Sequence, residues 1–115
     1  MSNKQVEIKI RHWLYINGKK FFGPGRLELL ERIQQTGSIV QAARGIGMSY
    51  KKAWDMIKVM NDLASTPFVI TKKGGARGGG AAITGHCTRL MDAYRKLTQV
   101  LEETANTHQE IIALI

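Results

Sequence analysis

Two points at which a glycine shortly precedes a serine divide the segment between residues 26 and 64 and constrain its fold, because these residues end and begin helices. Leucine and isoleucine recur at helical spacing before Gly37, which is placed as a C-terminal cap residue. Ser38 and Ser49 are both candidate N-terminal caps, and residues 45–48 between them include two glycines and predict a tight turn. The sequence therefore predicts three successive helices, over residues 26–35, 39–44 and 50–64.

Short strands are expected on both sides of these helices. Residues 6–16 alternate with period two, which predicts a half-buried strand, and the turn Asn17-Gly18 predicts a hairpin that returns over residues 19–22. The apolar side of the first strand comprises Val6, Ile8, Ile10, Leu14 and Ile16. Downstream, strands over residues 68–71 and 81–83 flank a nine-residue loop, 72–80, with five glycines and three cations.

Thr84 is expected to cap one last helix that continues to the end of the chain. Leu90, Tyr94, Leu97 and Leu101 begin a seam with alternating steps of four and three residues. The seam continues through polar Thr104 and His108 to Ile111 and Ile115. It predicts that two copies of the chain associate through this helix. The expected dimerisation residues are Leu90, Tyr94, Leu97, Leu101, Ile111 and Ile115.

The charge of the chain is unevenly distributed. The formal net charge is +8, and the first 83 residues hold 14 lysines and arginines against 5 acidic residues, while the remainder holds 3 against 4. A concentrated positive field attracts phosphate backbones or anionic lipid, although a basic surface can also serve solubility alone. The N-terminus is unlike a secretory peptide, and a single cysteine, Cys87, cannot form an internal disulfide. These features predict a cytoplasmic protein.

Three helices followed by a basic hairpin predict a single winged helix-turn-helix domain, mainly α with a small β component, over residues 1–115. Its parts are an N-terminal hairpin (1–22), a three-helix core (26–64), a wing (68–83) and a dimerisation helix (84–115). The third helix would enter the major groove of DNA, with Asn61 on its exposed side, and the wing would contact the backbone or minor groove. For Trp54, DNA contact and core packing remain open. The candidate DNA-binding residues are Ser38, Gln41, Arg44, Ser49, Tyr50, Lys51, Lys52, Trp54, Asp55, Lys58, Lys72, Lys73 and Arg77.

Other chemistry is not expected. The three histidines and Cys87 lack the spacing of a metal site, and the loop at 74–80 lacks the Gly-Lys-Ser/Thr ending of a P-loop. No nucleophile, base and orienting group can be assembled, so neither an enzyme nor a cofactor is expected. Asp55 is interpreted as a solvated residue or as an ion-pair partner of Lys51 or Lys58.

Residues 38–43 (SIVQAA) and 49–57 (SYKKAWDMI) resemble the N-terminal domain of ModE-type molybdate-responsive regulators and, more distantly, the LysR-type helix-turn-helix. The resemblance continues in Met60-Asn61, in the glycines of 74–80 and in Ala82-Ile83-Thr84, so that it covers roughly residues 26–101. It implies a winged-helix domain that dimerises through its last helix and binds operator DNA. Full regulators of the family also carry molybdate-binding modules. With the chain ending at Ile115, no such module is expected, and no small-molecule effector is evident from the sequence.

Two other functions fit the same pattern. A winged helix can serve as a protein-interaction adaptor, and the outward-facing Trp13 and Tyr15 would then form a partner surface. A non-specific architectural DNA-binding protein would have the same charge but no preferred sequence. The long seam and the two predicted reading surfaces favour sequence-specific DNA binding.

Overall fold

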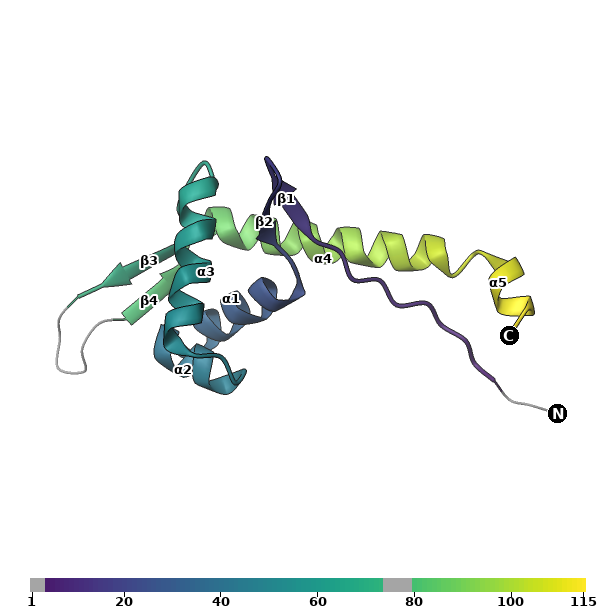
Figure 1. Cartoon of the computed structure of the whole chain (residues 1–115), viewed down its shortest axis with the longest axis horizontal. Helices are drawn as coiled ribbons and strands as arrows, with labels where there is room; N and C mark the ends of the chain where they lie inside the picture. The colour runs from purple at the N-terminus through teal and green to yellow at the C-terminus, as the bar shows by residue number, and fades with distance from the viewer. Residues whose placement is uncertain (1–3, 74–79) are drawn as a thin grey trace.

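The computed structural model describes residues 4–73 and 80–115 (Figure 1). The chain is mainly helical with two small antiparallel sheets, which confirms the expected class at this level. The elements in chain order are β1 (Leu14–Ile16), β2 (Lys19–Phe22), α1 (Pro24–Thr36), α2 (Ile39–Gly45), α3 (Tyr50–Leu63), β3 (Val69–Lys72), β4 (Gly80–Ile83), α4 (Gly85–Ala105) and α5 (Gln109–Ala113).

The predicted caps lie where α1 ends and where α2 and α3 begin, while α1 begins at Pro24, two residues earlier than predicted. Gly37 ends α1 in the left-handed conformation, with φ of 68°. The hydroxyl oxygen of Ser38 accepts a hydrogen bond from the backbone N–H of Gln41, and that of Ser49 accepts one from Lys52, each over 3.1 Å. Capping therefore sets the starts of α2 and α3 locally, before any tertiary contact is considered.

The two sheets are both hairpins. Asn17 and Gly18 turn between β1 and β2 with positive φ angles of 49° and 79°, as the Asn-Gly pair predicts. The second hairpin pairs β3 with β4, with Val69 opposite Ile83. It is attached to the helices because the N–H of Ala81 donates to the carbonyl of Gly37 over 2.9 Å.

The N-terminal strand is much shorter than predicted. The alternation is confirmed, since the apolar side of residues 6–16 is half-buried and the other side is exposed. Strand pairing nevertheless covers only Leu14–Ile16, and the extended residues 6–13 lie along α4 instead (Figure 1). Side chains of α4 supply hydrogen-bond partners that a neighbouring strand would supply in a sheet, and period-two patterning cannot distinguish the two cases.

The last helix is interrupted, which corrects the expectation of one helix from residue 84 to the C-terminus. Thr84 caps α4 as predicted, its oxygen accepting from the N–H of Cys87 over 3.2 Å. However, α4 ends at Ala105, and the short α5 follows after Asn106–His108. The side chain of Asn106 accepts from the N–H of Ile8 over 2.8 Å and donates to its carbonyl over 3.1 Å. This contact with the N-terminal segment holds Asn106 as the C-terminal cap of α4.

The molecule consists of a body and a projecting arm. The arm comprises residues 4–13, the second half of α4 from residue 97, and α5; it carries both termini at its far end (Figure 1). The molecule measures 62 × 33 × 22 Å, and its radius of gyration is 17.8 Å. A compact domain of this length would have a radius of about 13 Å. The arm therefore exposes much of its surface to solvent.

Asn61 on α3 has a structural role rather than the exposed position that the sequence suggested. Its side-chain oxygen accepts from the N–H groups of Phe68 and Val69, over 2.8 and 3.2 Å, and its amide nitrogen donates to the carbonyl of Val69 over 3.0 Å. All three bonds connect α3 to the beginning of β3. The prediction that Asn61 belongs to the exposed side of α3 is therefore wrong.

We expect Asn61→Ala to lower the free energy of unfolding by about 1–3 kcal/mol, because three partly buried backbone groups would lose their partner. Urea denaturation at pH 7 measures the change. Asp62→Ala, at the neighbouring exposed position, is the matched control and should change stability by no more than about 0.5 kcal/mol. Equal effects of the two substitutions would contradict the role of Asn61.

Cys87 lies in the core at the start of α4 and has no solvent exposure. Burial raises the pKa of its thiol to about 12, because the thiolate would lose its solvation. We expect the native protein to react with Ellman's reagent at pH 8 about a hundredfold or more slowly than the guanidinium-unfolded protein, since the thiolate is the reactive form. The native rate should remain low from pH 7 to pH 9. Similar native and unfolded rates would show that the thiol is accessible.

Candidate nucleic-acid interface

The connection between α2 and α3 holds the two helices in a fixed relation. The N–H of Met48 donates to the carbonyl of Ala43 over 2.9 Å, and Gly47 has a φ of 67° that favours glycine. Buried residues of α3 then face the body: Ala53, Ile57 and Met60. The opposite side of α3 is left to solvent.

The exposed side of α3 carries aromatic and cationic side chains together. Tyr50 and Trp54 follow each other at one helical turn and are 51% and 43% exposed. The exposed fraction of Trp54 excludes core packing, one of the two alternatives that the sequence left open, because a core residue would not remain accessible to this extent. Exposed residues of the predicted set on the same helix are Lys51, Lys52, Asp55 and Lys58.

A groove of about 560 Å³ lies between α2, the start of α3 and the β3–β4 hairpin. We call it the cationic groove, because Arg44, Lys72 and Lys73 line it and none of its described lining residues is acidic. The structure thus brings together seven predicted residues from three separate elements: Ser38, Gln41, Arg44, Tyr50, Trp54, Lys72 and Lys73. The remaining lining includes Thr71, which the sequence analysis missed. Its alternation with Ile70 and Lys72 in β3 gave no indication of which strand face meets the helices.

The other predicted residues are placed differently. The hydroxyl oxygens of Ser38 and Ser49 each accept a helix-capping hydrogen bond, which holds both side chains against the start of their own helix. Lys51 donates to the carboxylate of Asp55 over 3.0 Å, which is one of the two ion pairs considered from the sequence. Arg77 lies outside the described residues, as do residues 74–79 of the predicted wing.

The expected dimerisation residues fall into two groups. Tyr94 is buried in the chain's own core, where its ring stacks on His12 at 4.2 Å and its hydroxyl donates to the carbonyl of His12. Leu90 is half-buried against the same core. The other four predicted residues are exposed on the arm: Leu97, Leu101, Ile111 and Ile115. Two further exposed apolar residues of the arm, Val100 and Leu114, were missed by the heptad pattern. Val100 lies three residues after Leu97, a spacing that ordinary amphipathic periodicity would have included.

No helix within residues 4–73 and 80–115 combines the length and apolarity needed to cross a membrane. Within the same ranges, no three side chains among His, Cys, Asp and Glu gather as a metal site.

Comparison with known proteins indicates relatives among bacterial regulators. No protein-family model matches the chain. It is 36% identical over 110 residues to a protein named transcriptional regulator ModE from Haemophilus influenzae; the match covers 96% of this chain and 42% of that protein. It is 41% identical over 99 residues to the DNA-binding transcriptional dual regulator ModE of Escherichia coli K12, covering 86% of this chain and 37% of that protein.

A third relative is named molybdenum-pterin-binding protein MopB, from Rhodobacter capsulatus, and is 47% identical over 72 residues, covering 63% of this chain and 27% of that protein. The chain thus spans about two fifths of the length of the two ModE proteins. Neither of their names denotes an enzyme. Over most of its length, this chain is a homologue of proteins named as ModE transcription regulators.

Proposed function

We propose that the chain is a sequence-specific DNA-binding transcription regulator that binds operator DNA as a homodimer through a winged helix-turn-helix. The observation that carries this proposal is the cationic groove beside the exposed side of α3. Its cations come from two distant parts of the chain, Arg44 on α2 and Lys72 and Lys73 at the end of β3. Because its described lining holds no carboxylate to balance them, the groove suits a polyanion.

In the proposed complex α3 lies in the major groove. Its 14 residues make a rod about 21 Å long, and its first three residues, Tyr50 to Lys52, are exposed. Tyr50, Lys51, Trp54 and Asp55 then reach base edges, while the other cations hold the phosphates. The proposed phosphate contacts are Arg44, Lys52, Lys58, Lys72, Lys73 and Arg77.

The exposed apolar side chains of α4, of α5 and of the two residues after α5 are the proposed contact between two copies. Six of them lie on the arm, away from the cationic groove, so a partner that covers them leaves α3 accessible. A two-fold dimer of this kind binds two half-sites about 34–36 Å apart, one turn of DNA. The body of the molecule would thereby bind DNA, and the arm would hold the two copies together.

We expect two lysine substitutions to weaken DNA binding in different ways. Lys51→Ala should lose affinity chiefly for the preferred sequence, by about tenfold, because it removes a base contact. Lys72→Ala should weaken preferred and random duplexes alike and reduce the slope of log K against log salt by about one unit. Fluorescence anisotropy over several salt concentrations measures both, once selection from random duplexes has supplied a preferred sequence.

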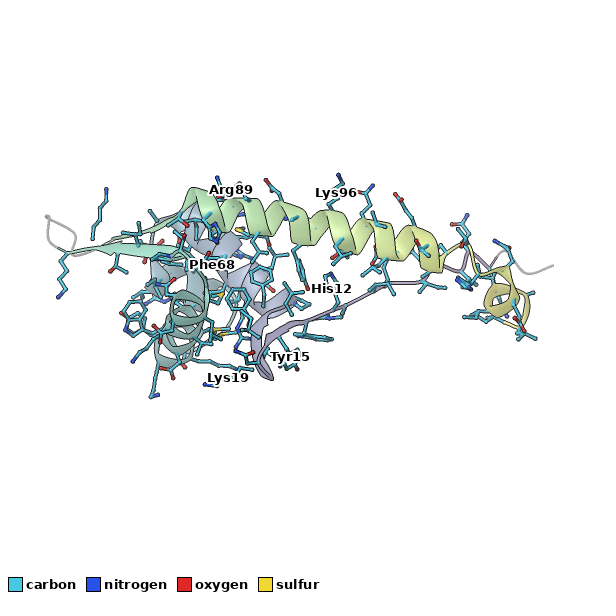
Figure 2. The ribbon with its side chains drawn as sticks, turned by 90° about the horizontal axis from the view of Figure 1, so that it is seen from above. His12, Tyr15, Lys19, Phe68, Arg89 and Lys96 are labelled. Carbon is cyan, nitrogen blue, oxygen red and sulfur yellow. The ribbon has the colours of Figure 1, made fainter. Side chains whose placement is uncertain are left out.

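The matched control is Lys96→Ala. Lys96 is exposed on α4 and points away from the α3 side of the molecule (Figure 2). This substitution should alter affinity by less than about twofold. Identical losses for Lys51→Ala and Lys72→Ala would overturn their separate roles, and the absence of any enriched sequence would favour an architectural DNA-binding protein.

A protein-interaction adaptor is the second candidate function, because one aromatic surface is exposed outside the proposed interface. Trp13 and Tyr15 are 45% and 59% exposed next to and within β1. A gel shift with pooled random duplexes at low salt separates the two functions. Complete absence of retardation would reject DNA binding and leave the adaptor function.

A further inference from the structure

The extended N-terminal segment, residues 5–12, is hydrogen-bonded along only one edge. The N–H and carbonyl of Ile8 bond to the side chain of Asn106, the N–H of Ile10 donates to the carboxylate of Glu102 over 2.9 Å, and the carbonyl of His12 accepts from the hydroxyl of Tyr94. Every second residue therefore turns its backbone towards α4. We call this the helix-side edge.

The partners on α4 form a stripe at steps of four residues: Tyr94, Thr98, Glu102 and Asn106, with Thr98 bonded to the ring of His12 over 2.8 Å. Four residues of helix rise by about 6 Å, and two residues of strand by about 6.7 Å. Because these two distances are similar, successive side chains of the stripe can form hydrogen bonds with every second residue of the segment. The segment is thus held straight, as a strand is held in a sheet.

The opposite edge belongs to Glu7, Lys9 and Arg11. In an extended chain their N–H and carbonyl groups point away from the helix-side edge, and in the described residues none of these backbone groups has a hydrogen-bond partner. Their side chains are exposed, and the segment forms the border of the arm, with α4 along one side of it (Figures 1 and 2). A straight, unpaired strand edge is a template for another strand.

The charges of this edge are complementary to themselves in one antiparallel register. If Ile8 faces the same residue across a two-fold axis, Glu7 of each copy lies opposite Lys9 of the partner subunit, twice. With the axis at Lys9 instead, Glu7 of each copy would face Arg11 of the partner subunit, but Lys9 would face Lys9; with the axis at Glu7, Glu7 would face Glu7. Only the register centred on Ile8 has opposite-charge pairs without a like-charge pair. Opposite charges in directly facing positions stabilise a strand pair, and like charges destabilise it.

We propose that a second copy of this chain pairs with residues 5–11 in this register, so that the two N-terminal segments form an antiparallel two-stranded ribbon between two α4 helices. This inference rests on the proposed homodimer and specifies how its copies meet. Glu7 and Lys9 are available for the contact, since their present ion pair, 3.6 Å long, is exposed on both sides and worth little. Leu97 and Val100 are also exposed on the arm.

Charge exchange tests the contact. Glu7→Lys and Lys9→Glu should each raise the dimer dissociation constant about tenfold, because each creates two like-charge pairs. The double substitution Glu7→Lys/Lys9→Glu restores both opposite-charge pairs and should recover the original constant within about twofold. Sedimentation equilibrium of the full chain measures all four proteins. Unchanged single variants, or a double variant weaker than either single one, would overturn the proposal.

Disulfide formation tests the register independently. Directly facing residues of a non-hydrogen-bonded pair have Cα atoms about 4.5 Å apart, within the range of a disulfide, whereas residues offset by two positions lie beyond about 7 Å. Ile8→Cys should therefore form a covalent dimer readily under mild oxidation, and Lys9→Cys should do so much more slowly. Cys87 is buried and common to both variants. The reverse order, or crosslinking of neither variant, would reject this register.

The outcomes also separate this inference from the proposed function. If the unsubstituted chain is a dimer that the charge variants leave intact, the strand pairing fails and the proposed homodimer stands. If the unsubstituted chain sediments as a monomer at micromolar concentrations, both fail. Retention of DNA affinity for a single half-site by the weakened dimers would support DNA binding whatever the result for the ribbon.

Discussion

The packing of Phe22 against Phe68 and Tyr94 determines how the parts of this molecule are arranged. Phe22 ends β2, Phe68 precedes β3 and Tyr94 lies midway along α4, and the ring of Phe22 is 6.4 Å from that of Phe68 and 4.9 Å from that of Tyr94. Such aromatic pairs contribute roughly 0.5–1.5 kcal/mol each beyond the area that they bury. Because the three rings belong to both hairpins and to α4, this contact fixes the cationic groove relative to the arm.

Tyr94 has a second function within this arrangement. Its ring belongs to the core, while its hydroxyl is the first partner in the stripe that holds the N-terminal segment. Desolvation by burial raises the pKa of Tyr94, so the hydroxyl remains the protonated donor that this bond requires. The same residue thus connects core packing to the position of the arm, so the packing of the core sets the direction in which the arm extends.

The local features of the fold were predictable from the sequence, and the partners of exposed or extended segments were not. Ser38, Ser49 and Thr84 cap helices because their hydroxyls reach backbone groups three residues away, an interaction that requires no distant information. The position of Asn61 could not be predicted in this way, since its partners at residues 68 and 69 depend on the turn after α3. Likewise, the heptad pattern located an apolar side of α4 but could not tell that the chain's own residues cover Tyr94. Seven residues of the cationic groove were predictable, whereas Thr71 was not, and the shape of the groove depends on the bond between Ala81 and Gly37.

The beginning of α3 shows how the protein's own charges are balanced in the absence of a partner. Lys51 and Lys52 lie in the first turn, where the helix dipole disfavours cations. Asp55 offsets part of this cost through its ion pair with Lys51, while Lys52 has no such carboxylate among the described contacts. A phosphate near this turn would meet both the positive end of the dipole and an uncompensated lysine. In the proposed complex, Lys52 therefore accounts for attraction to DNA of any sequence. Lys51 leaves Asp55 only where a base edge competes for it, and so accounts for the discrimination between sequences.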